Sequence, residues 1–94
     1  MRLRIKLLFF ASLRELVGAG ELEVSSAKNR ITVKEAVDLI ETVDKETRKI
    51  ILERISKNKI KIIVDGELID NTEIDSIYLR DGCALAFLPP MGGG

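Results

Sequence analysis

Hydrophobic and polar residues alternate along the first stretch of the chain, from Arg2 to Phe10. A period of two predicts a β-strand, because successive side chains of a strand point to opposite faces. One face carries Leu3, Ile5, Leu7 and Phe9, while the other begins with basic residues and ends with Leu8 and Phe10. Because both faces are apolar near Phe10, we expect a central strand or a partner surface at that end.

The next segment, "ASLRELVGAG", combines good helix formers with two closing glycines, Gly18 and Gly20. It predicts a short helical turn that ends at these glycines. The following "ELEVSS" predicts a second strand. Strand, turn and strand together form a hairpin-like unit.

Two helices are expected in the middle of the chain. The first covers "TVKEAVDLIETV", where Thr32 followed three residues later by Glu35 forms a capping-box pattern and apolar residues recur at helical spacing. Asp44 can cap a second helix over "KETRKIILERISK". This segment has acidic residues early and basic residues late, as the helix dipole prefers.

Alternation returns in "KIKIIVDGELI", where Asp65 and Gly66 supply a dipeptide that suits a tight hairpin turn. After the polar connection "DNTEIDS", the segment "YLRDG" predicts another turn. The last strand is "CALAFL", which Pro89 and Pro90 end because proline cannot continue a ladder of backbone hydrogen bonds.

This order of elements predicts an α+β fold, a mixed sheet with helices packed on one face. The first and last strands are expected to be central and parallel, since both are apolar on two faces near Phe10 and Leu88. With 94 residues, 46% of them hydrophobic, the chain can bury one core. We therefore expect a single domain over residues 1–94, in which residues 89–94 form a flexible C-terminal tail.

Charge and composition exclude several functions. Fifteen basic and fifteen acidic residues cancel and mostly alternate, so the chain lacks the positive field that nucleic-acid binding requires. There is no histidine, which leaves no usual zinc site or catalytic triad, and we expect the single Cys83 to be a strand residue rather than a reactive thiol. The absence of a long apolar run predicts no membrane anchor and a cytoplasmic location.

The segment "FLPPMGGG" closes the sequence and contains the best candidate for chemistry. Pro89 and Pro90 stiffen the exit from the last strand, and Met91 to Gly94 could extend about 13–14 Å. The Gly94 carboxylate, with an ordinary pKa of about 3.3–3.7, is ionised and needs activation before it can react. Because the chain has no phosphate-binding motif, we expect no bound cofactor and ATP use by a partner enzyme. A frayed terminus without chemistry is the alternative.

The two ends of the sequence resemble a known family. The opening "LLFFASLRELVG" and the closing "LRDGCALAFLPPMGGG", roughly a third of the chain, resemble the small subunit of molybdopterin synthase. That subunit is a sulfur carrier with the ubiquitin-like β-grasp fold. The resemblance therefore implies a β-grasp domain whose partners are the large synthase subunit and an adenylyltransferase like the ubiquitin-activating enzymes.

The resemblance also implies a mechanism and a set of site residues. Gly94 would be adenylated and converted to a thiocarboxylate, and the tail would enter the large subunit and give its sulfur to precursor Z during molybdenum or tungsten cofactor biosynthesis. Phe10 and Leu88 match apolar positions of the partner surface, and Arg14 matches a basic position near the activating enzyme. The tail that carries Gly94 comprises Pro89, Pro90, Met91, Gly92 and Gly93.

Other functions use the same tail. A ubiquitin-like modifier would be joined to lysines of other proteins through Gly94, with an amine in place of sulfur. A sulfur carrier for thiamin or tRNA thiolation is a second alternative, and an interaction domain whose tail does no chemistry is a third. The sequence does not separate the carrier from the modifier, because both need the same activated carboxylate.

Overall fold

Five strands form one mixed sheet in the computed structural model, which describes residues 2–90. Across the sheet the order is β2-β1-β7-β4-β5, so β1 and β7 are central, and these two strands are parallel. All other neighbouring strands in this sheet are antiparallel. The strand bounds are β1 Leu3–Phe9, β2 Glu21–Ser26, β4 Lys61–Val64, β5 Glu67–Ile69 and β7 Ala84–Leu88. The predicted central, parallel first and last strands are confirmed.

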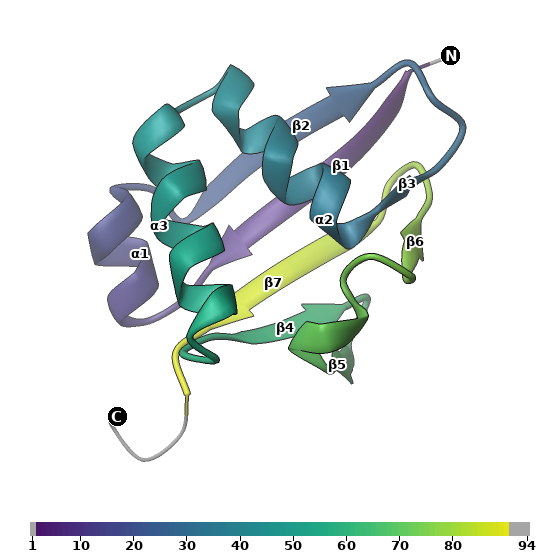
Figure 1. The fold of residues 1–94 in the computed structure, drawn as a ribbon. Helices are drawn as coiled ribbons and strands as arrows, with labels where there is room; N and C mark the ends of the chain where they lie inside the picture. The colour runs from purple at the N-terminus through teal and green to yellow at the C-terminus, as the bar shows by residue number, and fades with distance from the viewer. Residues whose placement is uncertain (1, 91–94) are drawn as a thin grey trace.

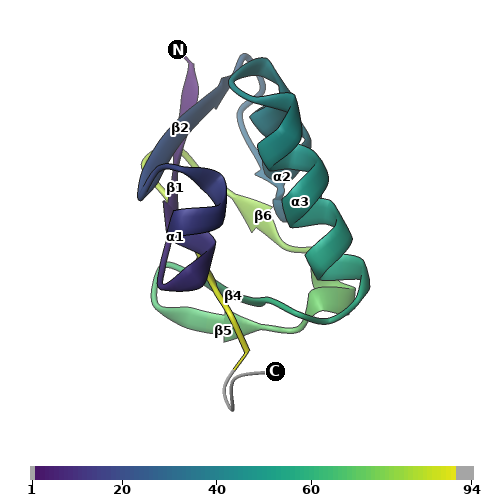
Figure 2. The ribbon, with the colours of Figure 1, turned by 90° about the vertical axis from the view of Figure 1, so that its left-hand side faces the viewer.

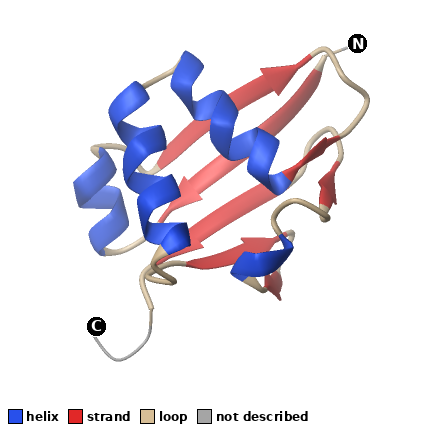
Figure 3. Cartoon of the chain, viewed as in Figure 1, coloured by secondary structure: helices blue, strands red, loops and turns tan. Residues whose placement is uncertain are grey.

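The helices α2 and α3 cover one face of this sheet, as Figures 1 and 3 show. Figure 2 shows the same helices from the side, as a layer separate from the strands. We call the face without these helices the outer face. The helical elements are α1 Ser12–Val17, α2 Val33–Asp38 and α3 Lys45–Ser56, with 3-10 turns η1 Leu39–Thr42 and η2 Asn71–Glu73. The predicted α+β architecture is confirmed.

The core lies between the sheet and the helices. Strand β1 buries every second side chain, and the rings of its Phe9 and of Phe87 from β7 stack with centroids 5.4 Å apart. Helical residues complete the core from the other side, and those that are fully buried are Leu13, Val33, Ala36, Val37, Ile40 and Ile51. Burial of these side chains is the main force that fixes the helices on the sheet.

Both predicted helix caps are confirmed. The Thr32 hydroxyl oxygen accepts a hydrogen bond from the Glu35 backbone N–H at 3.1 Å, and the Glu35 carboxylate accepts one from the Thr32 N–H at 3.0 Å. These two bonds complete the capping box of α2. At α3, a carboxylate oxygen of Asp44 accepts from the Glu46 N–H at 3.0 Å.

Helix α2 is shorter than the helix predicted from the sequence. An α-helix over 32–43 was expected, but α2 ends at Asp38 and the chain continues as the 3-10 turn η1. The backbone N–H groups of Val43 and Asp44 both donate to the Ile40 carbonyl at 2.8 Å. This tight turn buries Ile40 and releases Asp44 to cap the next helix.

The prediction of a turn over "YLRDG" is wrong for its first two residues. Tyr78–Leu79 forms strand β6, which pairs with β3, Ile31–Thr32, in a second small sheet. Leu79 and Ile31 are both buried, and the Arg30 guanidinium lies 4.2 Å from the centre of the Tyr78 ring. Burial of this pair therefore overrides the local turn signal, and the turn is confined to the residues that follow Leu79.

The hairpin turn between β4 and β5 is confirmed at Asp65 and Gly66. Both residues have positive φ angles, 47° and 87°, as a tight hairpin turn of this sequence requires. The antiparallel register that follows pairs Val64 with Glu67. In this way the turn sets which residues of β4 and β5 share a face.

Candidate functional site

The predicted tail begins where β7 leaves the sheet. Strand β7 ends at Leu88, and Pro89 and Pro90 follow outside the ladder, both partly buried. Each proline has a fixed φ and no backbone N–H, so the exit from the sheet is stiff. The predicted tail residues Met91, Gly92 and Gly93 and the predicted reactive residue Gly94 lie outside the described residues.

Phe10 and Leu88 are neighbours beside this exit. The parallel register pairs Phe9 with Phe87, and the ladder continues because the Phe10 N–H donates to the Phe87 carbonyl at 3.1 Å. Since Phe9 and Phe87 face the core, the residues that follow them face the other way. Phe10 is 45% exposed and Leu88 is partly buried, so the structure places this predicted pair together on the outer face.

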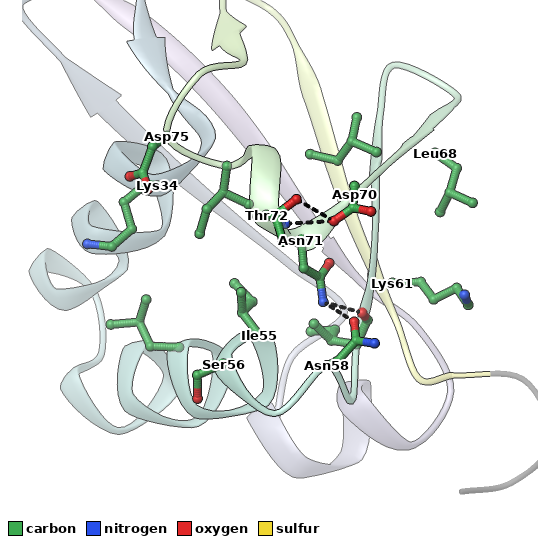
Figure 4. A pocket seen from close by; sticks show the side chains of 14 residues that line it. Lys34, Ile55, Ser56, Asn58, Lys61, Leu68, Asp70, Asn71, Thr72 and Asp75 are labelled. Carbon is green, nitrogen blue, oxygen red and sulfur yellow. Dashed lines mark hydrogen bonds between the residues drawn. The ribbon is translucent and has the colours of Figure 1, made fainter.

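A wider apolar surface surrounds this pair. One row of paired residues crosses four strands on the outer face, Leu8 beside Ala86, Ala86 beside Ile63, and Ile63 beside Leu68. Leu68 is 59% exposed, and Figure 4 shows that its side chain points away from α3, as does that of Lys61. We call the following residues the outer patch: Leu8, Phe10, Ile63, Leu68, Ala86 and Leu88.

Sequence reasoning did not find the β4 and β5 members of the outer patch. Ile63 lies in a run of apolar residues, and its face depends on the register of β4 against β7. Lys61 pairs with Leu88 in the same register, which puts a basic residue at the border of the outer patch beside the tail exit. Alternation along a single strand predicts which of its residues share a face. Which residues of neighbouring strands lie side by side on that face depends on the strand register.

Arg14 lies on α1, close to the same end of the sheet. Helix α1 starts at Ser12, two residues after Phe10, whose carbonyl accepts from the Leu13 N–H at 3.1 Å. The Arg14 side chain is exposed, and within residues 2–90 its guanidinium has no hydrogen-bond or ion-pair partner. Phe10 and Leu88 therefore lie together at the exit of β7, while the Arg14 side chain lies at the same end of the sheet beside Gly20, on the β2 side of β1.

Comparison with known proteins assigns the chain to a family. The family model described as "ThiS family" matches residues 7–94. The chain belongs to the ThiS family. It is thereby a member of the ubiquitin-like sulfur carriers and modifiers. No curated protein matches the chain.

Solved structures share the fold of this ThiS-family chain. Small archaeal modifier protein 1 from Haloferax volcanii superposes with a TM-score of 0.71 at 22% identity, over 97% of this chain and 99% of that one. The same-named protein from Methanosarcina acetivorans gives 0.65 at 23% identity, over 100% and 99%. A putative molybdopterin converting factor, subunit 1, from Pyrococcus furiosus gives 0.66 at 24% identity, over 95% and 99%. These likenesses confirm the ubiquitin-like β-grasp fold.

Cys83 of this ThiS-family chain lies far from the tail exit, at the opposite end of β7. The residue immediately precedes β7 rather than lying inside it, and its thiol donates a hydrogen bond to the Asp65 carboxylate at 2.9 Å. Burial, together with this bond to Asp65, raises the pKa of the Cys83 thiol to about 11. A protonated, buried thiol is a weak nucleophile, so the structure supports a packing role for Cys83.

A groove of about 1030 Å³ separates the carboxyl end of α3 from η2 and β5 (Figure 4). Its polar groups bond to one another, because the Asn71 amide donates to the Asn58 side-chain oxygen at 3.0 Å and to the Ile60 carbonyl at 3.1 Å. Across residues 2–90, no group of three His, Cys, Asp or Glu side chains is arranged to hold a metal. Over the same residues, no helix is long and apolar enough to cross a membrane.

Proposed function

We propose that this ThiS-family chain is a sulfur carrier, the small subunit of a molybdopterin synthase, and that it donates sulfur to precursor Z in molybdenum or tungsten cofactor biosynthesis. The observation that carries the proposal is the continuity between the outer patch and the tail exit. Phe10 and Leu88 border Pro89, so a partner that covers the outer patch also receives whatever follows Pro90. Membership of the ThiS family supports the same chemistry.

The proposed chemistry takes place at Gly94. Its carboxylate attacks the α-phosphorus of ATP held by an adenylyltransferase like the ubiquitin-activating enzymes, which releases pyrophosphate and forms the acyl-adenylate. A sulfur nucleophile at the oxidation level of sulfide then attacks the carbonyl carbon, AMP leaves, and a thiocarboxylate results. When the sulfur passes to precursor Z, an oxygen from water restores the carboxylate. The chain supplies the carboxyl group that carries the sulfur, and its partners supply the sulfur and the catalytic groups.

The described residues have distinct parts in this scheme. The outer patch binds the large synthase subunit and the activating enzyme in turn, because apolar surface removed from water stabilises a complex. Pro89 and Pro90 restrict the directions in which the tail leaves the sheet. Arg14, which follows Phe10 on α1 and lies against Gly20, contributes a positive charge at the position that matches a basic residue near the activating enzyme.

Intact-mass analysis of the protein from its native cells tests the class of function. We expect a fraction of the protein molecules to carry one sulfur in place of one oxygen. This sulfur should be removed by hydrolysis and should map to Gly94. Species heavier by the mass of a second protein would favour the modifier instead. If the chain is found only in its unmodified form under conditions that induce cofactor synthesis, the interaction domain without tail chemistry is the remaining function. Transfer of labelled sulfur to precursor Z, compared with the thiamin precursor and tRNA, then identifies the acceptor.

Changes in tail length test the role of Gly94. Removing Gly94 moves the carboxylate about 3.5 Å from its target, and a displacement of 1 Å can already lower a rate about 100-fold. We therefore expect at least a 100-fold loss of adenylation in the deletion variant and in a variant with one added residue. ATP–pyrophosphate exchange measures this step, and thermal unfolding serves as the control, with no change in Tm. Activation of both variants at the parental rate would contradict the carrier and the modifier together.

A further inference from the structure

Gly18 and Gly20 are glycines for different reasons. Gly18 closes α1 with a φ of 83°, a left-handed conformation that other residues adopt at a cost, and a Cβ there would meet nothing within 4 Å. Gly20 has no such φ angle, but a Cβ there would lie 3.1 Å from both Cζ and Nε of Arg14. The Arg14 side chain, rather than the backbone, is therefore what favours glycine at position 20.

The contact between Arg14 and Gly20 is held from both sides by the backbone. The Gly20 carbonyl accepts a hydrogen bond from the Phe9 N–H at 2.9 Å, which ties Gly20 to the end of β1. On the other side, the Arg14 N–H donates to the Ala11 carbonyl at 3.1 Å in the first turn of α1. The fold thus fixes the backbones of Arg14 and Gly20 at a separation that lets the guanidinium lie against Gly20.

Arg14 is nevertheless exposed and has no polar partner within residues 2–90. Most exposed arginines sample many rotamers, and binding must restrict them at an entropic cost. Close contact along the Gly20 backbone removes part of that freedom before a partner arrives. A guanidinium presents five donors in a rigid fork, so its orientation matters for any acceptor that it meets.

We infer that Gly20 is a positioning residue for the activation step. Because it has no side chain, the Arg14 guanidinium can lie against its backbone and is thereby oriented toward the adenylyltransferase. This inference rests on the proposed function. It assigns Gly20 no contact with ATP or with Gly94. Any side chain at position 20 displaces the guanidinium, by a few tenths of an ångström for alanine and by more for a branched side chain.

The expected signature is a change in KM with kcat retained, because the geometry at Gly94 is untouched. Loss of a hydrogen bond to a charged group corresponds to roughly a tenfold or larger effect, so we expect Arg14→Ala to raise the KM for this protein by about that factor. Gly20→Val should approach the same value, and Gly20→Ala should fall between. In an Arg14→Ala background, Gly20→Val should add less than about twofold, since the residue through which it acts is absent.

The experiment measures ATP–pyrophosphate exchange by the adenylyltransferase of the same cells, with the parent, the single variants and the double variant as substrates. Gly18→Ala is the matched control, since it strains the backbone at a neighbouring glycine whose added Cβ would meet nothing within 4 Å, and so leaves the Arg14 side chain uncontacted. It should lower Tm and leave KM unchanged. Gly20→Ala should raise KM without lowering Tm. The φ angle of Gly20 suits alanine, and a Gly-to-Ala change restricts the unfolded chain.

A measurement on the isolated protein accompanies the kinetics. Nuclear spin relaxation at Arg14 Nε should report greater side-chain mobility in Gly20→Val than in the parent. An unchanged KM for Gly20→Val, or an equal rise in KM with and without Arg14, would overturn the inference while leaving a functioning carrier. If the parent itself is not adenylated, the proposed function and this inference both fail.

Discussion

Asp65 joins the hairpin of β4 and β5 to the start of β7. Its backbone N–H donates to the Ala84 carbonyl, and its carboxylate accepts from the Ala84 N–H and from the Cys83 thiol, each at 2.9 Å. The bond from the Ala84 N–H, followed by that from Cys83, holds the pKa of Asp65 below its ordinary value. The same residue thus shapes the turn with its backbone and fixes the neighbouring strand with its side chain.

The Cys83 thiol makes the free energy of unfolding depend on pH in the alkaline range. Its pKa of about 11 in the folded protein exceeds the unfolded value of about 8.5, so its contribution is complete below pH 8.5 and is lost as the pH rises through 11. The loss is less than about 3.4 kcal/mol, the value that corresponds to the whole difference between 8.5 and 11, because solvent screening at a thiol this close to the surface reduces it. Urea unfolding between pH 7 and pH 11 should show a steeper decline for the parent than for Cys83→Ala. Parallel declines for the two proteins would contradict this assignment.

At the scale of the element, the capping box of α2 makes a local contribution that can be measured. Thr32→Ala removes the acceptor for the Glu35 N–H and should reduce the free energy of unfolding by about 1 kcal/mol, within a range of roughly 0.5–2 kcal/mol. Urea denaturation measures this change. Glu41→Ala, at an exposed position in η1 whose side chain makes no hydrogen bond or ion pair within residues 2–90, is the control and should change stability by less than about 0.5 kcal/mol. Equal losses for the two variants would argue against the cap.

Elements specified by neighbouring residues were predictable, and elements specified by distant residues were not. Thr32 with Glu35 and Asp65 with Gly66 act over three residues or fewer, so their signals are visible in the sequence. Strand β6 depends on Ile31 pairing with Leu79, 48 positions later, which no local pattern reveals. The outer patch was half predictable, because alternation exposes Phe10 and Leu88 whereas Ile63 and Leu68 join them only through strand register.

At the scale of the whole molecule, the two faces of the central strands have different roles. Phe9 and Phe87 face the helices and belong to the core, while the next residue of each strand faces outward beside the tail exit. The fold and the proposed docking surface are thereby separable by mutation, although they share the same strands. Substitutions on the outer face should change binding and leave the core intact.

Phe10→Asp together with Leu88→Asp tests this separation. Burying each side chain in a complex should contribute roughly 1.5–3 kcal/mol before entropic costs, so the double variant should lose binding to the large synthase subunit. Calorimetric titration measures the binding, and circular dichroism checks that the fold remains. Val43→Asp is the control, since Val43 is 50% exposed but follows η1 on the helical side. A double variant that binds as tightly as the parent would remove the outer patch as a docking surface.

The parallel pairing of β1 with β7 also has a consequence for biosynthesis. Leu8 lies beside Ala86, 78 positions later, so the central pair of the sheet joins the two ends of the domain. Such non-local pairing makes folding slow compared with that of helical proteins. A nascent chain still lacking β7 has no strand beside Phe10, and its β4–β5 hairpin has no connection to β1. Under the proposed function, partners that recognise the outer patch would distinguish finished domains from incomplete translation products, and would commit ATP only to the former.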